Sequence, residues 1–325
     1  MGRLLRIATY NLENLGGEVD SDAELDVRVT ALRPRLLRLD ADILCLQEIN
    51  ARHRHGGDRG LIALERLLAH TPYTDFHRAT TLNAAGTGPR DVHNLVILSR
   101  FPIVARRQIR HDLVAAPEYR SVTAEPPAIR PQAIEWDRPI LHATVDVMGR
   151  ALDVINLHLR APRSAYLPGQ KQSPSVWNTI AGWAEGFFLA DIKRSGQALE
   201  ARLLIEHLFD EAGDARIVVC GDFNAELSSV PLAILCAEVA NTGNPALGDR
   251  VLFPAETRVP KAARYSVLHS GRRLLLDHVL VSRPLIARLK RAELHNEDLR
   301  DDAVGDAEPA SFHAPVLAVF DFGET

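Results

Sequence analysis

The sequence has little of what marks several common classes of protein. Its 325 residues include only 3 cysteines, and only 4 of its 38 basic residues are lysine. The formal net charge is −4, and the isoelectric point is near 6.4. The protein as a whole therefore carries no excess of positive charge that would attract nucleic acid.

The cysteines and the apolar segments exclude further classes. Cys45 and Cys220 lie in apolar strand-like runs and Cys236 in an apolar helix-like run, so we interpret all three as small buried hydrophobes in a reducing compartment. No apolar run has the length of a membrane span, and no secretory hydrophobic region precedes the first predicted strand. We therefore expect a soluble, cytoplasmic protein.

The remaining composition is that of an ordinary globular protein. Hydrophobic residues make up 46% and charged residues 25% of the chain, enough to bury a sizeable core. No internal repeat or low-complexity linker marks a boundary. We predict a single α/β domain over residues 1–325. Loop inserts are expected near 111–139 and 160–185, and long irregular inserts are uncommon unless they are functional. Trp177 and Trp183 lie in the second insert.

Hydrophobic periodicity predicts an alternation of strands and helices. Predicted strands span residues 4–10, 43–48, 95–98, 140–147, 151–157, 217–219, 274–281 and 316–320. Helices are expected around 25–36 and 61–68, in a long segment containing Ile192, Leu199, Leu203 and Leu208, and in a short segment after residue 222.

The segment around Asp222 places a carboxylate and an amide where a buried strand ends. Gly221 allows a sharp turn after the strand, and side chains two residues apart on extended chain point the same way. Asp222 and Asn224 can then converge on one ligand, the first accepting a proton or holding a cation. Turns also favour both residue types for backbone reasons, so the pair alone does not define a site.

Other polar residues also lie at or near the ends of predicted strands. Strand ends in an α/β protein open on a shared edge, where such proteins place their sites. A single shared site explains these polar residues better than a chance scatter among strand ends does. Its members are Asn11, Glu48, Asn156, His158, Asp222, Asn224, Asp277 and His313.

Seven short segments, in order along residues 9–315, together resemble the endonuclease/exonuclease/phosphatase family, which includes deoxyribonuclease I, sphingomyelinases and deadenylases. They are Thr9-Tyr10-Asn11, Leu46-Gln47-Glu48, Leu98-Ser99-Arg100-Phe101-Pro102-Ile103, Asn156-Leu157-His158-Leu159, Gly221-Asp222-Phe223-Asn224, Leu276-Asp277-His278-Val279-Leu280-Val281-Ser282 and Ser311-Phe312-His313-Ala314-Pro315. The resemblance implies a four-layered α/β sandwich, in which two packed mixed β-sheets are flanked by helices.

The resemblance also implies roles for metal and water. Glu48, assisted by Asn11, would hold a Mg²⁺ or Mn²⁺ ion, a hard cation that suits a few oxygen ligands at an open site. Asp222 would align or deprotonate the attacking water. Asn224 would hold either the phosphate or Asp222 in register.

Further residues would contact the phosphate. His313 would donate to a non-bridging oxygen, with Asp277 setting its tautomer, and His158 would face the phosphate from the other side. Asn156, Arg160 and Asn94 are predicted to bind the phosphate. Two of them have an alternative role: Arg160 could instead be solvated, and Asn94 could be a structural cap.

One position departs from the family pattern. The family has Ser-Asp-His where this chain has Ser311-Phe312-His313. Either Glu48 is the chief metal ligand, or a carboxylate from residues 300–308 substitutes, or the protein is a non-catalytic relative.

Three functions remain as hypotheses. The first is a divalent-metal-dependent phosphodiesterase or nuclease, with Trp177 and Trp183 able to stack on bases. The second is a phosphomonoesterase acting on a small or lipid-linked phosphate. The third is a catalytically inactive nucleic-acid-binding relative. The substrate is thus a phosphate ester, with nucleic acid as one candidate, and the sequence does not indicate the oligomeric state.

Overall fold

The frame of the protein is a pair of six-stranded mixed sheets. The computed structural model describes residues 4–17, 21–53, 58–303 and 310–323. In order across the first sheet, the strands are β19 (Leu289–Leu294), β20 (Val316–Asp321), β1 (Leu4–Leu15), β2 (Ile43–Ile49), β6 (Asn94–Ser99) and β5 (His77–Thr80). Across the second they are β15 (Phe253–Pro254), β18 (Asp277–Val281), β14 (Ile217–Asp222), β11 (Ala151–His158), β10 (Ile140–Asp146) and β7 (Ile103–Ile109).

Each sheet contains one parallel pair of strands, and this pair positions the predicted site. β1 pairs with β2 in the first sheet, and β11 pairs with β14 in the second. The carboxyl ends of parallel strands lie at one edge of a sheet. His158 and Asp222 are therefore direct partners across β11 and β14, while Asn11 and Glu48 reach the corresponding edge of the first sheet.

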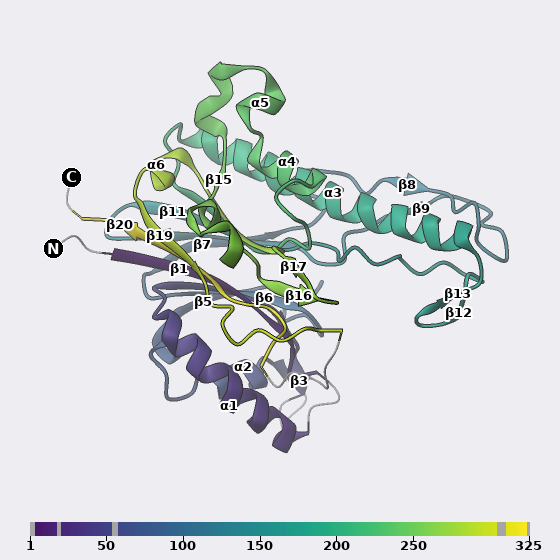
Figure 1. Cartoon of the computed structure of the whole chain (residues 1–325), viewed down its shortest axis with the longest axis horizontal. Coiled ribbons are helices and arrows are strands. Elements are labelled where there is room, and N and C mark those ends of the chain that lie inside the picture. Colours follow the sequence, from purple (N-terminus) through teal and green to yellow (C-terminus); the bar gives the residue numbers. More distant parts are fainter. Residues whose placement is uncertain (1–3, 18–20, 54–57, 304–309, 324–325) are drawn as a thin grey trace.

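Helices cover the outer face of both sheets, which gives four layers (Figure 1). The first sheet is covered by α1 (Asp22–Leu39) and α2 (Ile62–Leu68), and the second by α3 (Ile180–Glu211) and α4 (Val230–Cys236). The predicted four-layered sandwich is confirmed. Two one-turn helices, α5 (Val239–Thr242) and α6 (Arg283–Ile286), complete the helices.

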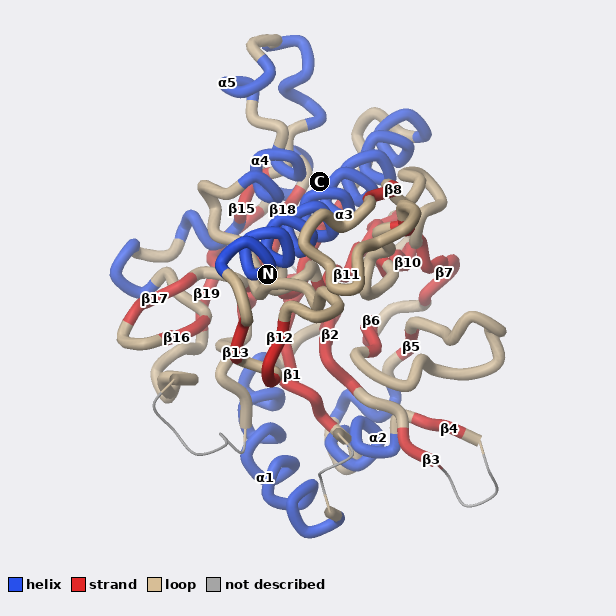
Figure 2. The backbone as a smooth tube through the Cα atoms, turned by 90° about the vertical axis from the view of Figure 1, so that its right-hand side faces the viewer, coloured by secondary structure: helices blue, strands red, loops and turns tan. Residues whose placement is uncertain are grey.

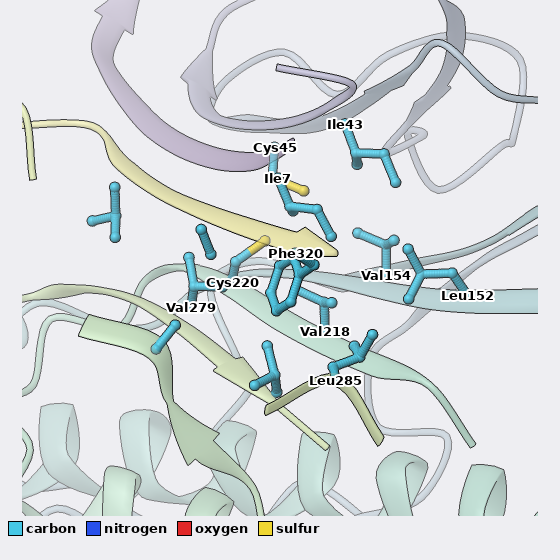
Figure 3. Close-up of a cluster of buried hydrophobic side chains, with 14 of the residues drawn as sticks. Ile7, Ile43, Cys45, Leu152, Val154, Val218, Cys220, Val279, Leu285 and Phe320 are labelled. Atoms are coloured by element: carbon cyan, nitrogen blue, oxygen red, sulfur yellow. The ribbon is translucent and has the colours of Figure 1, made fainter. Parts of the chain in front are cut away.

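Apolar side chains fill the space between the two sheets (Figure 3). Ile7 and Cys45 contribute from the first sheet, and Val154 and Val218 from the second. Separate clusters pack each sheet against its helices. All three cysteines are free and buried, as predicted for small hydrophobes.

The helix α1 shows why the sequence pattern was informative. Ser21 and Glu24 form a reciprocal capping box at its start. The side chains at helical spacing all face the first sheet, as predicted: Leu25, Val29, Leu32 and Leu36.

Three predicted elements have different boundaries. The first strand continues past Asn11 to Leu15, because left-handed backbone at Glu13 and Asn14 shifts its register against β2 without ending it. The predicted strand 274–281 is two elements, since β17 (Arg272–Leu274) ends before β18 begins at Asp277. β5, β7 and β19 were not predicted.

The long helix α3 begins earlier than predicted. The side chain of Thr179 accepts a hydrogen bond from Gly182 N and starts the helix, so the second irregular insert ends near residue 179 and Trp183 is helical. Gly182 and Gly186 disguised this start, since glycine disfavours helix interiors. Leu199 is also 42% exposed, because the helix buries Ala198, Ala201 and Leu204 instead.

The two inserts and the first turns of α3 form an arm that projects from the sheets (Figure 1). We define the arm as residues 111–139 and 160–190. It contains two short hairpins, β8 (Glu118–Tyr119) with β9 (Gln132–Ala133), and β12 (Lys171–Ser173) with β13 (Val176–Trp177). Trp136 anchors the first insert, since its indole N–H donates to Glu200 at 2.8 Å and only 1% of the residue is exposed.

Two further hairpins lie beside the sheet edge from which the arm projects (Figure 2). They are β3 (Arg52–His53) with β4 (Arg59–Gly60), and β16 (Val267–His269) with β17. No helix within the described ranges is both long enough and apolar enough to cross a membrane.

Candidate active site

A cleft of about 330 Å³ opens at the carboxyl ends of the two parallel strand pairs. Its walls come from both sheets and from the arm. A polar cleft with convergent titratable groups is the usual form of an active site. The residues that line it are Glu13, Asn14, Glu48, His93, Arg138, His158, Arg160, Ala161, Arg163, Asp222, Asn224, Val267, Asp302, Phe312 and His313.

Asp222 lies between the two sheets at the end of β14. Its Oδ1 accepts from the backbone N–H of Asn224 at 2.8 Å, and its Oδ2 accepts from the side-chain amides of Asn224 and Asn11 at 3.1 and 3.0 Å. Burial, reinforced by Asp277, raises the pKa of Asp222 to about 7, against the opposing charge of His313. The carboxylate is thus held rigidly and is poised near neutral pH.

Gly221 allows β14 to bring Asp222 to this position. Its φ is +143°, a conformation that side chains rarely permit, and a Cβ atom there would overlap the backbone oxygen of Leu157 on β11. Asn224 also has a left-handed backbone, with φ of +48°. The turn seen in the sequence therefore orients Asp222 as well as ending the strand.

His313 and Asp277 form one wall of the cleft. His313 Nδ1 lies 2.8 Å from Asp277 Oδ2, and its Nε2 lies 3.9 Å from Asp222 Oδ2. Burial by itself would lower the pKa of His313, but the carboxylates of Asp277 and Asp222 outweigh it and raise the pKa to about 10. His313 is therefore a cation at neutral pH.

His158 lies on the opposite wall with the reverse electrostatics. Its Nε2 is 3.4 Å from Asp222 Oδ2 and 3.5 Å from Glu48 Oε1. Burial and the nearby Arg138 guanidinium lower the pKa of His158 well below its usual value. His158 is neutral, and its buried Nδ1 has no hydrogen-bond partner within the part of the chain that is described.

Glu48 projects into the cleft from β2 with a left-handed backbone, at φ of +60°. Its Oε1 accepts from Asn11 Nδ2 at 3.2 Å, and its Oε2 accepts from the backbone N–H of Asn14 at 3.0 Å. The Asn11 amide thus joins Glu48 to Asp222. The Asn11 oxygen is occupied by the Glu13 N–H at 2.9 Å, so this geometry fits a positioning role for Asn11 better than the predicted metal contact.

The donor set suits a hard divalent cation. Two groups have ligand atoms within 4.8 Å of one another, namely Glu48 with His158 and Asp222, and Asp222 with Asp277 and His313. Carboxylate oxygens are the ligands that Mg²⁺ and Mn²⁺ prefer. Glu48 faces the open cleft, where a cation could keep part of its water shell, so the residues fit such an ion.

Two predicted phosphate contacts lie outside the cleft. Asn156 is fully buried between the sheets, where its amide accepts from Gln47 at 2.8 Å and donates to the backbone oxygens of Leu46 and Val96 at 3.0 Å. Asn94 is equally buried and bonds to Thr81 and the backbone around Ile49. Both amides satisfy buried groups of the protein. Asn94 therefore has the structural role that was its alternative, and neither side chain lines the cleft.

Arg160 does line the cleft, but it is not a free cation. Its Nη1 lies 3.0 Å from Asp137 Oδ2, and Lys193 holds the other oxygen of the same carboxylate at 2.7 Å. Arg160 thus faces the cleft and remains about one-third exposed, and its contact with a phosphate stays a prediction.

Phe312 is half-buried at the cleft, and a carboxylate does lie beside it. Glu13 accepts the backbone N–H of Phe312 at 2.7 Å, and burial raises the pKa of Glu13 above its usual value. Sequence reasoning missed Glu13, although it stands two residues after Asn11. Of residues 300–308, Asp302 lines the cleft and pairs with His269 at 2.7 Å, whereas residues 304–308 lie outside the described residues.

His93 and Arg138 were also missed, although each stands two residues before a predicted strand. Arg138 Nη2 lies 3.0 Å from His93 Nδ1, and the two side chains stand beside His158. A larger cavity of about 470 Å³ lies at the opposite end of the second sheet, against His142 and Asp153. It contains neither of the two groups of possible metal ligands, so the smaller cleft is the better candidate.

The family model described as Endonuclease/Exonuclease/phosphatase family matches residues 8–299. The chain belongs to this family, whose members are hydrolytic phosphoesterases. No curated protein matches the sequence.

Solved structures share the fold at low sequence identity. A family protein from Bacteroides thetaiotaomicron is 17% identical with a TM-score of 0.58, covering 99% of this chain and 96% of its own. Truncated TDP2 from Caenorhabditis elegans is 13% identical with a TM-score of 0.57, covering 98% of each chain. The 3′ phosphatase NExo from Neisseria, bound to a product DNA hairpin, is 19% identical with a TM-score of 0.51, covering 98% of this chain and 99% of its own.

Proposed function

We propose that this protein is a divalent-metal-dependent phosphodiesterase or nuclease that hydrolyses a phosphate ester with an activated water. The observation that carries the proposal is Asp222, held by Asn11 and Asn224 between the cationic His313 and Glu48 in one cleft. A base, a cationic donor and a metal ligand converge there, as phosphate-ester hydrolysis requires.

Asp222 is the general base of this proposal. A base is most effective when its pKa is close to the working pH, and burial brings the pKa of Asp222 to about 7. The side-chain amides of Asn11 and Asn224 hold the carboxylate in a single orientation toward the cleft. Asp222 therefore takes a proton from a water placed between β14 and β2.

His313 stabilises the negative charge that develops on the phosphate. Its protonated Nε2 donates to a non-bridging oxygen, while Asp277 holds Nδ1 and so fixes the ring. The neutral His158 faces the same phosphate from the other wall. Its Nε2–H can donate a hydrogen bond without adding a second positive charge.

Glu48 would hold the Mg²⁺ or Mn²⁺ ion, with Glu13 and the second oxygen of Asp222 nearby in the cleft. When bound, such an ion polarises the phosphate and offsets charge on the leaving oxygen. Glu48 is kept in place by Asn11 and the Asn14 N–H.

Nucleic acid is the substrate class that we favour. The DNA hairpin named with NExo supports this choice by analogy of fold. A phosphomonoesterase acting on a small phosphate is the alternative, since NExo is named a 3′ phosphatase.

The test is hydrolysis of bis-p-nitrophenyl phosphate with Mg²⁺ or Mn²⁺, compared with mono-p-nitrophenyl phosphate and with nicking of plasmid DNA. Glu48→Gln should lose nearly all turnover and weaken Mn²⁺ binding measured by electron paramagnetic resonance. Asp146→Asn, at the opposite end of the second sheet, is the matched control and should retain both. Turnover of the monoester alone would favour the phosphatase, and no turnover with any divalent metal would favour the inactive relative.

A further inference from the structure

The arm exposes a pair of aromatic side chains on α3. Trp183 and Phe187 lie one helical turn apart, with ring centroids 5.6 Å from each other. They remain 46% and 38% exposed, although large aromatic side chains usually find cover in a folded protein. An exposed pair of neighbouring aromatic rings indicates a binding surface.

The surface of α3 that carries this aromatic pair extends to the wall of the cleft. Arg194 lies on the same stripe of α3, seven residues after Phe187, and its Nη1 donates to the backbone oxygen of Arg160 at 3.3 Å. The segment from Arg160 onward runs back along the helix, with Ser164 donating to the Trp183 carbonyl at 3.0 Å. At 1.5 Å per residue, this wall extends roughly 16 Å from Arg194 to Trp183.

The same wall carries a surplus of positive charge. Arg163 lines the cleft, is exposed, and has no carboxylate within ion-pair distance among residues 4–17, 21–53, 58–303 and 310–323. Nearby, Arg160 and Lys193 share the single carboxylate of Asp137, and Arg194 pairs with Asp191. Four cations thus face two carboxylates, although the whole protein is slightly acidic.

Trp177, the other aromatic candidate in the sequence, has a different role. Its ring packs where a Cβ on Gly186 would touch it, and Lys171 Nζ lies 4.8 Å above its face. It closes the insert against α3, so only Trp183 of these two residues offers a free ring face.

We propose that the aromatic pair Trp183 and Phe187, together with Arg163 at the cleft, binds unpaired nucleotides of the nucleic-acid strand whose scissile phosphate lies in the cleft. This inference rests on the proposed nuclease function. Bases stack on exposed aromatic rings whatever their identity, and arginines track the phosphates. The continuity with the cleft and the local cation surplus favour this strand over an apolar partner.

The test measures binding separately from turnover. Anisotropy of a fluorescein-labelled oligothymidylate, recorded in EDTA, gives affinity without hydrolysis. Trp183→Ala and Phe187→Ala should each weaken binding about tenfold, and a strand of abasic sites should bind wild type weakly and respond to neither variant. Phe188→Ala is the matched control, because Phe188 is 50% exposed on the same helix but packs on Tyr119 of the other insert.

Hydrolysis of bis-p-nitrophenyl phosphate, which is too small to reach the arm, should be unchanged in all three variants. If it is absent from wild type as well, the proposed function fails, while the binding result still judges the aromatic pair. Equal effects of Trp183→Ala and Phe188→Ala, or no preference for the strand with bases, would overturn the inference. Trp183-dependent binding to phosphatidylcholine vesicles in place of the oligonucleotide would assign the aromatic pair to a membrane surface instead.

Discussion

The two walls of the cleft present the same side chain in opposite states. His313 is held by Asp277 at 2.8 Å and has its pKa raised to about 10. Burial, reinforced by the nearby Arg138, lowers the pKa of His158 well below the usual value. Both reach toward Asp222. The comparison teaches that the surroundings of each histidine, its burial and its charged neighbours together, assign charge to one wall and neutrality to the other.

Removing the charged wall should have the largest effect. We expect His313→Ala to lower kcat for bis-p-nitrophenyl phosphate by about 10²–10⁴-fold, because the donor to the phosphate is lost. His77→Ala, at the exposed far end of β5, is the control and should match wild type. Steady-state kinetics with Mn²⁺ measure both, and a loss below tenfold would show that the charged wall is not needed.

Removing the glycine that sets Asp222 between the walls should destabilise the fold. Gly221→Ala forces a Cβ against Leu157 on the His158 wall and strains the backbone, which should lower the free energy of unfolding by about 3 kcal/mol. Gly149→Ala meets no atom within 4 Å at φ of +78°, so it should cost only about 1 kcal/mol. Urea denaturation compares the two, and equal losses would mean that the contact with Leu157 is unimportant.

The pH profile should reflect both walls. Activity needs Asp222 deprotonated and His313 protonated, so it should rise as pH passes about 7 and fall as pH passes about 10. The slope of each limb should be about tenfold per pH unit. In Asp277→Asn the alkaline limb should move to lower pH, because the carboxylate that raises the pKa of His313 is gone. An unmoved alkaline limb would assign it to another group.

The contribution of His313 to stability has the same origin and a definite sign. Its pKa is higher in the folded protein than the ordinary 6.5, so the stabilisation is fully present below that value and is lost as pH rises toward 10. The contribution of Asp222 has the same sign. Its pKa is raised to about 7, so ionisation from pH 4 to 7 weakens the fold.

The smallest expected effect is on the neutral wall. Removing the guanidinium in Arg138→Ala should raise the pKa of His158 toward its usual value while leaving His313 nearly unchanged. Nitrogen-15 NMR titration of the imidazole rings follows both residues in one sample. If His158 stays neutral to the same pH in Arg138→Ala, burial alone sets its state.

Much of the fold could be predicted because local pattern and final burial agree. The continuous apolar runs of β2 and β14 and the helical spacing of the apolar residues in α1 agree with their burial in the structure. Prediction failed where packing against another segment overrides local preference. The glycines of α3 look like loop residues, yet Gly182 and Gly186 let Gln170 and Ala165 approach the helix. β5, β7 and β19 were missed because they are sheet-edge or exposed strands with little apolar pattern.

The candidate site was predictable as a set of residues and not as an arrangement. Asp222, His313, His158 and Glu48 could be named because each lies at or near the end of a predicted strand, and the structure places all four in one cleft. Asn156 and Asn94 follow the same rule, but they face the interior. The direction of an amide at a strand end depends on the sheet packed above it, which the strand's own sequence does not contain.

The sequence by itself determined the layered α/β fold, the family and the identity of the groups that can do chemistry, because apolar period and residue type are local properties. Only the tertiary structure decided that Asn11 joins Glu48 to Asp222, that Glu13 stands beside Phe312, and that two histidines take opposite charge states. The reason is physical: a pKa and a hydrogen bond depend on what lies within a few ångströms, and at this site Asn11 and Asp222 come from strands and stand 211 residues apart in the chain.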